Sequence, residues 1–297
     1  MRTRKDLTDR QNKNLPWKIQ ASLNSICEFY EKNNGMVYVA FSGGRDSTVL
    51  AYLVRYLYPE VPLVFCDTGM EYPEIRRFVK TFSNVVFLKP KKSFRRTLEE
   101  NGYPVISKKV SMSVSRYRGT LDPDVQRPLR LFGGINPTSG KYQYPTIPKK
   151  YHHIVNAPFK ISDYCCQVMK KAPFKRYQKE TGRVPYIGTM ASESESRRLE
   201  YLKDGCNKYY GIISSKPLSI WTKDDIIEYL RDKPYCSIYD DGYGSTGCMF
   251  CMFGIYQESK KGLNRFQKMK ISHPKHYNVA INTFGIGKIL DYLEIEY

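Results

Sequence analysis

Short apolar runs alternate with stretches of helical periodicity along much of this chain. In the helical stretches, apolar residues recur every three or four positions, as Ile19, Leu23 and Ile26 do after Pro16. The expected helices cover residues 16–33, 46–58, a segment opened by Pro73, and 222–231 with Thr222 as its N-cap. The expected strands cover residues 36–41, 61–66, 85–88 and 184–188. This alternation predicts an α/β fold with a doubly wound parallel sheet.

The loops that follow the first two strands, 42–47 and 67–72, are expected to share one crevice, because ligands bind beyond the carboxyl ends of parallel strands. Residues 119–150 are rich in Gly, Pro, Thr and Lys without sustained periodicity, so they are interpreted as a long insertion or flap with no assigned elements. The expected organisation is an N-terminal helical segment (1–35), an α/β nucleotide-binding domain (36–232) and a smaller, cysteine-containing helical region (233–297).

The net charge of the chain indicates which classes of partner it can bind. Forty-eight Lys and Arg against 29 Asp and Glu give a net charge of +19, which attracts polyanions such as nucleotides and nucleic acid. Twenty-five tyrosines lie among the cations and suit base stacking, although a generally basic surface without such a partner is the alternative. No run approaches the roughly 18 apolar residues of a membrane span, and the N-terminus lacks the apolar core of a signal peptide. We expect a cytoplasmic protein that does not bind membranes.

The loop Ser42-Gly43-Gly44-Arg45-Asp46-Ser47 carries the clearest chemistry. Two glycines let the backbone approach an anion, two hydroxyls flank it, and the following helix turns its free N–H groups toward the same point. Its spacing is not that of the NTPase P-loop. The loop therefore predicts a site for a pyrophosphate-like group; the alternative is a glycine-rich turn that only joins strand to helix.

The cysteines form a second constellation. Cys165 and Cys166 are adjacent, and Cys248 and Cys251 follow as a CxxC pair. Two close pairs of thiolates can be brought to one point, and four-cysteine ligation is shared by iron–sulfur clusters and structural zinc. In a reducing compartment, metal or redox chemistry explains such cysteines better than disulfides do. The residues themselves leave a [4Fe–4S] cluster, Zn²⁺ and unliganded buried thiols open.

Taken together, these motifs resemble those of the phosphoadenosine phosphosulfate (PAPS) reductase-like, iron–sulfur branch of the PP-loop ATP pyrophosphatases. The further segments that carry the resemblance are 67–74 (DTGMEYPE), 165–173 (CCQVMKKAP) and 188–197 (GTMASESESR). The resemblance implies a HUP-like adenine nucleotide alpha hydrolase fold and a [4Fe–4S] cluster held by Cys165, Cys166, Cys248 and Cys251. It implies nucleotide contacts from Ser42, Gly43, Gly44, Arg45, Asp46, Ser47, Asp67, Thr68, Gly69, Glu71, Gly188, Glu193, Ser194 and Arg197. For the last segment, the alternative is a helix capped by Ser194 with Arg197 on a solvated face.

The loop resembles those of the ATP-using members more than those of the reductases. The expected activity is cleavage of ATP to AMP and pyrophosphate, with Mg²⁺ near Asp46 and charge stabilisation by Arg45 and Arg197. This step would activate an acceptor, tRNA or DNA, for sulfur transfer together with a sulfur donor or reductant protein.

Two alternatives remain open. The first is reduction of adenylyl sulfate (APS) or PAPS to sulfite; the resemblance implies a C-terminal Cys nucleophile for it, and residues 252–297 contain no cysteine. Cys206 or Cys236 could replace that nucleophile, although Cys206 could equally be a buried thiol or an extra cluster ligand. The second is a non-catalytic nucleotide and iron–sulfur sensor that binds nucleic acid.

Overall fold

The computed structural model describes residues 2–297, and the chain divides into two compact units. Unit 1 comprises the chain up to Asp67, Glu71–Lys89 and Pro173–Thr246, whereas unit 2 comprises Thr68–Met70, Pro90–Ala172 and Gly247–Tyr297. This division differs from the three consecutive segments suggested by the sequence. The reason is that the crossover after the third strand of the sheet carries a long insertion, which forms unit 2 together with the C-terminal residues.

Unit 1 is built on a six-stranded sheet with the order β3-β2-β1-β7-β9-β8. Its strands are β1 (Val37–Ala40), β2 (Leu63–Cys66), β3 (Val85–Leu88), β7 (Val184–Ile187), β8 (Asn207–Lys208) and β9 (Ser214–Ser215). All neighbours pair in parallel except β8 and β9, which are antiparallel. The chain runs outward from β1 to β3 and then returns to the other side of β1. The predicted doubly wound α/β fold is confirmed.

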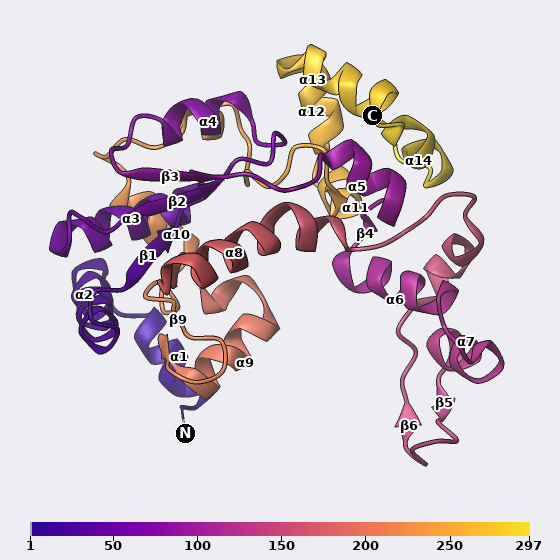
Figure 1. Ribbon diagram of the computed structural model, residues 1–297, viewed down its shortest axis with the longest axis horizontal. Helices are drawn as coiled ribbons and strands as arrows, with labels where there is room; N and C mark the ends of the chain where they lie inside the picture. The colour runs from indigo at the N-terminus through magenta and orange to yellow at the C-terminus, as the bar shows by residue number, and fades with distance from the viewer. Residues whose placement is uncertain (1) are drawn as a thin grey trace. The chain divides into compact units, whose positions relative to one another are not determined.

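The helices of unit 1 pack around this sheet (Figure 1). They are α1 (Arg4–Gln11), α2 (Leu15–Lys32), α3 (Arg45–Leu57), α4 (Pro73–Val79), α8 (Ala172–Thr181), α9 (Glu195–Asp204) and α10 (Lys223–Tyr229), with short turns η3 (Ala191–Glu193) and η4 (Ser237–Tyr239). Thr222 caps α10 as predicted, in a capping box with Asp225. The α8 residue Tyr177 packs edge-on against Tyr38 of β1, so α8 covers the face of the sheet to which Tyr38 points.

Unit 2 is mainly helical. Its elements are α5 (Phe94–Asn101), β4 (Val105–Ile106), α6 (Lys108–Arg118), α7 (Pro123–Phe132), β5 (Gly134–Ile135), β6 (Tyr142–Gln143), η1 (Lys149–Asn156), η2 (Gln167–Lys171), β10 (Met252–Phe253), α11 (Ile255–Ser259), α12 (Arg265–Ser272), α13 (Pro274–Asn278), η5 (Val279–Thr283) and α14 (Ile286–Tyr292). The short strands β4 and β10 pair in parallel. The rings of Phe94, Phe250 and Phe284 pack together in the core of the unit.

The expectation of no regular elements over residues 119–150 is corrected by the structure. Helix α7 occupies part of this stretch, and β5 and β6 form an antiparallel hairpin after it. The helix escapes detection because only Leu129 is buried and because Pro128 lies inside it. The hairpin strands are two residues long, too short to show an alternating pattern.

Within the described part of the chain, we find no helix with the length and apolar character that crossing a membrane requires.

Candidate functional site

The loop 42–47 joins β1 to α3 in unit 1 and is closed by its own hydroxyl groups. The backbone N–H of Ser42 donates to Ser47 Oγ (3.1 Å), and that of Gly44 donates to Ser42 Oγ (3.3 Å). Ser47 Oγ in turn donates to the Gly44 carbonyl (2.9 Å). Gly44 is the N-cap of α3, and because glycine has no side chain it cannot cap the helix. The first backbone N–H groups of this 13-residue helix therefore face the loop without an acceptor from the N-cap residue. This arrangement favours an anion.

Gly43 is required by the shape of the loop. Its φ of +72° lies in the left-handed region, and a Cβ there would stand 2.9 Å from Val79 Cγ2 and 3.0 Å from Ile75 Cγ2. Any other residue would be strained by its backbone and would crowd α4. The glycine therefore lets the loop pack closely against α4.

A tyrosine that the sequence analysis missed covers the start of α3. The hydroxyl of Tyr239 accepts a hydrogen bond from the Arg45 N–H (3.1 Å) and shares another with Thr246 Oγ1 (2.9 Å). The Arg45 guanidinium lies over the rings of Tyr239 (4.2 Å) and Tyr235 (5.1 Å). The Tyr239 hydroxyl thus accepts from the Arg45 N–H, one of the backbone donors that were expected to bind a phosphate. No pattern around it could have revealed this role, because tyrosine is common in this chain.

The segment 188–197 is brought to the loop, as the expected site requires. A Cβ on Gly188 would stand 3.0 Å from the Asp46 carbonyl oxygen, so the two backbones are in close contact. Glu193 and Arg197 form an ion pair, and Ser194 caps α9 by accepting from the Arg197 N–H (3.3 Å). The capping role weighed as an alternative for Ser194 is therefore present.

Asp46 is the most perturbed carboxyl of this group. Burial raises its pKa to about 6, the Glu193 carboxylate adds to the rise, and Arg197, Lys223 and Arg45 oppose it. An incompletely compensated carboxylate beside helix N–H groups suits a divalent cation that accompanies phosphates. Such perturbation is frequent at functional sites.

The second loop divides between the two units. Asp67 follows β2, which pairs with β1, so it lies at the same edge of the sheet as the loop 42–47. Its carboxylate forms an ion pair with Arg76 (2.8 Å), and Glu71 is buried nearby along the chain. Thr68 and Gly69 belong to unit 2, so they are not placed with the loop.

The two thiols considered as substitute nucleophiles lie in unfavourable surroundings. Cys206 lines a separate cavity of unit 1, of about 470 Å³, to which no residue of the loop 42–47 contributes. Burial raises the pKa of Cys206, and burial also raises the pKa of Cys236. Activated thiols require the opposite, a lowered pKa and an electropositive setting.

The four cysteines of the second constellation line one cavity of unit 2. Cys165 and Cys166 precede η2, whereas Cys248 and Cys251 form a turn in which the Cys251 N–H donates to the Cys248 carbonyl (3.1 Å). The cavity is small, about 20 Å³, and otherwise mainly apolar, with one basic residue; the remaining lining residues are Met70, Phe94, Pro104, Met169 and Lys170. The structure thus brings the two predicted pairs together.

The thiols of this cavity differ in acidity. The hydrogen bond with Cys165 lowers the pKa of Cys166 to about 6, and Lys108 and Lys170 contribute to the lowering. The same hydrogen bond raises the pKa of Cys165, and burial raises that of Cys251 to about 11. Among residues 2–297, no three His, Cys, Asp or Glu side chains already converge as they would on a single metal ion.

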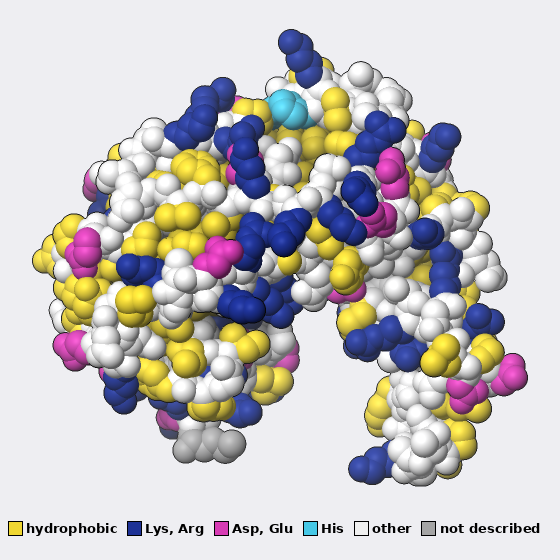
Figure 2. Space-filling view, viewed as in Figure 1, with side chains coloured by type: hydrophobic (Ala, Val, Ile, Leu, Met, Phe, Trp, Pro, Cys, Tyr) yellow, Lys and Arg dark blue, Asp and Glu magenta, His cyan; other side chains and the backbone are white. Residues whose placement is uncertain are grey.

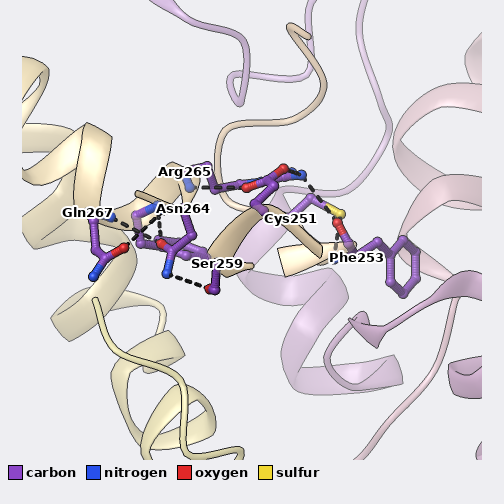
Figure 3. A network of polar contacts seen from close by, with 8 residues as sticks. Cys251, Phe253, Ser259, Asn264, Arg265 and Gln267 are labelled. Carbon is purple, nitrogen blue, oxygen red and sulfur yellow. Dashed lines mark hydrogen bonds and ion pairs between the residues drawn. The ribbon is translucent and has the colours of Figure 1, made fainter. Parts of the chain in front are cut away.

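A polar network fixes the CxxC turn to the C-terminal helices (Figure 3). The Phe253 N–H donates to Cys251 Sγ (3.4 Å), and the Arg265 guanidinium donates to the Phe253 carbonyl (3.2 Å). Arg265 also pairs with Glu258. Asn264 caps α12 and donates to the Glu296 carbonyl (2.7 Å). Residues near the C-terminus therefore help to hold Cys251 in place.

Comparison with known proteins gives one family. The sequence profile described as the phosphoadenosine phosphosulfate reductase domain matches residues 36–115 and 139–253. An adenosine 5'-phosphosulfate reductase of Staphylococcus epidermidis is 23% identical over 78% of this chain and 76% of its own length. Among solved structures, the phosphoadenylyl-sulfate reductase of Candida auris aligns with a TM-score of 0.42 and 18% identity, over 71% of this chain and 80% of that one.

Two longer relatives match as well. An uncharacterized protein of Methanocaldococcus jannaschii is 27% identical over 91% of this chain and 53% of its own length. A second uncharacterized protein of that organism is 25% identical over 84% of this chain and 42% of its own length. The chain therefore spans about half the length of these two curated relatives.

Proposed function

Because the chain belongs to the phosphoadenosine phosphosulfate reductase domain family, we propose that unit 1 binds an adenine nucleotide at the loop 42–47 and that this nucleotide is ATP. One observation carries the proposal: the glycine loop, the start of α3 and the Glu193–Arg197 pair surround a carboxyl whose pKa burial raises to about 6. A helix N-terminus binds phosphate oxygens, and Asp46 supplies a ligand for the Mg²⁺ that accompanies them.

The proposed reaction is adenylation. An oxygen of the acceptor attacks the α-phosphorus of ATP, the bond from that phosphorus to the bridging oxygen breaks, and pyrophosphate leaves. The loop holds the β- and γ-phosphates, while the guanidinium groups of Arg45 and Arg197 offset the charge that develops at the α-phosphate. Arg45 can do this only after its guanidinium leaves the rings of Tyr235 and Tyr239.

We propose that the four cysteines of unit 2 hold a [4Fe–4S] cluster. Four cysteines around one cavity also match the ligand set of a single Zn²⁺, which is the alternative occupant. Four-cysteine ligation is the ligand set of [4Fe–4S] clusters, and the four thiols that would hold one line this cavity. The lowered pKa of Cys166 favours the thiolate form that ligation needs. When bound, the cluster would supply electrons or handle sulfur for the transfer step.

The proposed acceptor is nucleic acid, tRNA or DNA, served by a separate sulfur donor or reductant protein. The net charge of +19 supports a polyanionic partner. The second candidate function is reduction of APS or PAPS to sulfite, which the names of relatives such as the Staphylococcus epidermidis reductase favour.

The test is pyrophosphate release from Mg-ATP by anaerobically purified protein, with and without total tRNA or DNA. We expect release that rises with nucleic acid and is lost in Asp46→Ala. The matched control is Asp224→Ala, which removes an exposed carboxylate from the first turn of α10 and should leave release unchanged. If no condition gives pyrophosphate while APS or PAPS with a thiol reductant gives sulfite, the adenylation proposal is wrong and the reductase takes its place.

A further inference from the structure

Positive charge is concentrated in the insertion of unit 2. Residues 108–171 contain twelve Lys and Arg against three Asp and no Glu, so about a fifth of the chain carries +9 of its net +19. Arg118 serves the fold, because it donates to four carbonyls within 154–159. Nine of the others are exposed: Lys108, Lys109, Arg116, Arg127, Lys141, Lys149, Lys150, Lys160 and Lys171.

These nine cations are not neutralised by carboxylates of the protein. None of them forms an ion pair with a carboxylate within residues 2–297. In Figure 2, dark blue side chains gather over the part of the molecule where Figure 1 draws α6 and α7. Cations without partners on one surface attract a polyanion more strongly than the same charges in ion pairs would.

A groove of about 360 Å³ lies within this charged region. Lys109 comes from the first turn of α6 and Lys150 from η1, and both line the groove. The start of α6 adds backbone N–H groups, of which only that of Val110 is capped by Ser107. The hydroxyl oxygen of Thr146 is buried there without a hydrogen-bond partner in the described chain. Two ammonium groups and helix N–H groups together suit a phosphate of a nucleic-acid backbone.

Aromatic side chains stand next to the groove. The hairpin β5–β6 leads into it through Pro145, and the Tyr142 and Tyr144 side chains remain 58% and 77% exposed. Their rings contact each other edge-on with centroids 5.1 Å apart. Such rings offer stacking surfaces for bases, and only unpaired bases have free faces to stack on them. The groove and this hairpin, here called the insertion surface, therefore favour a single strand over a duplex.

The groove also adjoins the cysteine cavity. In the paired strands β4 and β10, Pro104 before β4 lines the cysteine cavity, whereas Ile106 lines the groove. On the other strand, Cys251 lines the cavity and Gly254 lines the groove. Because β4 and β10 run parallel, the cysteine cavity lies where both strands begin and the groove lies where both end. A nucleic-acid strand in the groove would therefore lie about one short β-strand away from the thiols.

We propose that the insertion surface binds single-stranded nucleic acid, with phosphates on Lys109 and Lys150 and unpaired bases on Tyr142 and Tyr144. The identification of this strand as the acceptor rests on the proposed function. The binding itself needs no ATP, so it can be tested separately.

The test measures fluorescence anisotropy of the full protein, without nucleotide, with a labelled 15-nucleotide single strand, as DNA and as RNA, and with the matching duplex. We expect the single strand to bind at least about tenfold more tightly than the duplex, and the tighter of DNA and RNA identifies the sugar. Tyr144→Ala should weaken single-strand binding about 5- to 100-fold, as loss of one stacked base does. Tyr56→Ala is the matched control, because Tyr56 is equally exposed (77%) on α3.

The contribution of charge is tested with the double variant Lys109→Gln/Lys150→Gln. Its control is the double variant Lys175→Gln/Lys179→Gln, which removes the same charge from exposed positions on α8. The first pair should reduce the slope of log affinity against log salt by about 1.4, or about 0.7 for each lost phosphate contact, and the second should leave it unchanged. Equal effects from both pairs, or duplex binding as tight as that of the single strand, would overturn the proposal. If binding follows the expected pattern but no pyrophosphate is released, the insertion surface still binds single-stranded nucleic acid. Only its role as the site of the acceptor is then wrong.

Discussion

Replacing Asp46 with Asn should stabilise the nucleotide-free protein at neutral pH while it removes ATP cleavage. The carboxyl is partly buried, and burial raises its pKa from 3.8 to about 6. The neighbouring cations offset only part of this rise, because Glu193 lies among them. A charge that costs stability and is nevertheless present beside a phosphate-type loop is the expected mark of a functional group.

The sign and size of the effect follow from linkage. Below pH 3.8, the carboxyl is protonated in both the folded and the unfolded chain, so it costs nothing. As the pH rises toward 6, the unfolded state ionises first and folding stability is lost; above 6 the loss is complete. A shift from 3.8 to about 6 corresponds to about 3 kcal/mol. Asn is neutral and close in size to Asp, so Asp46→Asn should recover most of this free energy of unfolding.

The assay is urea unfolding without nucleotide or Mg²⁺, at pH 7.5 and near pH 4. We expect Asp46→Asn to be about 3 kcal/mol more stable than the parent at pH 7.5 and less than about 1 kcal/mol more stable near pH 4. The contrasting control is Asp6→Asn, since the hydrogen bond from the Thr3 N–H lowers the pKa of Asp6 and its loss should destabilise at pH 7.5. A gain for Asp46→Asn that is equal at both pH values, or a loss at pH 7.5, would refute the reasoning.

Three further substitutions test the packing of unit 1. Lys18→Met leaves Asp225 without its buried partner at 2.6 Å, so the free energy of unfolding should fall by about 3–5 kcal/mol; a fall below 1 kcal/mol in urea unfolding would contradict this. Gly43→Ala places a Cβ at a φ of +72° against α4. Equilibrium dialysis should show weaker ATP binding, and urea unfolding should show that the free energy of unfolding falls by about 1–3 kcal/mol. Tyr239→Phe removes the hydroxyl that accepts from the Arg45 N–H, which frees this N–H for a phosphate. The Kd for Mg-ATP should therefore fall about 2- to 10-fold in the same dialysis. A higher Kd would show instead that the hydroxyl assists binding.

The main strands of the sheet could be predicted because each reads as a continuous apolar run, although burial on both faces is complete only for β2. Val85–Leu88 was predicted to the residue, and the other three main strands within two residues. The two-residue strands, β4 and β10 among them, have no such signal, because two positions cannot show a period. Their pairing depends on contacts between residues about 150 positions apart, which a local pattern does not contain.

The candidate sites could be predicted where the chemistry is written in consecutive residues. The loop 42–47, the segment 188–197 and the cysteine pairs each carry a spacing that limits what they can do. Tyr239 carries no such spacing, and its contact with Arg45 exists only because the chain after α10 folds back over α3. Sequence patterns therefore located the groups expected to bind ligands but not the group that covers one of them.

The acidity of the thiols decides where sulfur chemistry fits this chain. A free thiol acts as a nucleophile through its thiolate, so that role needs a pKa near or below neutrality. Burial raises the pKa of Cys206 and Cys236 and keeps these thiols protonated, whereas Cys166 has a pKa lowered to about 6 by Cys165 and by two lysines. Within the four-cysteine cavity a lowered pKa is found at Cys166. The raised pKa values of Cys206 and Cys236 argue against either of these thiols as the nucleophile of a reductase.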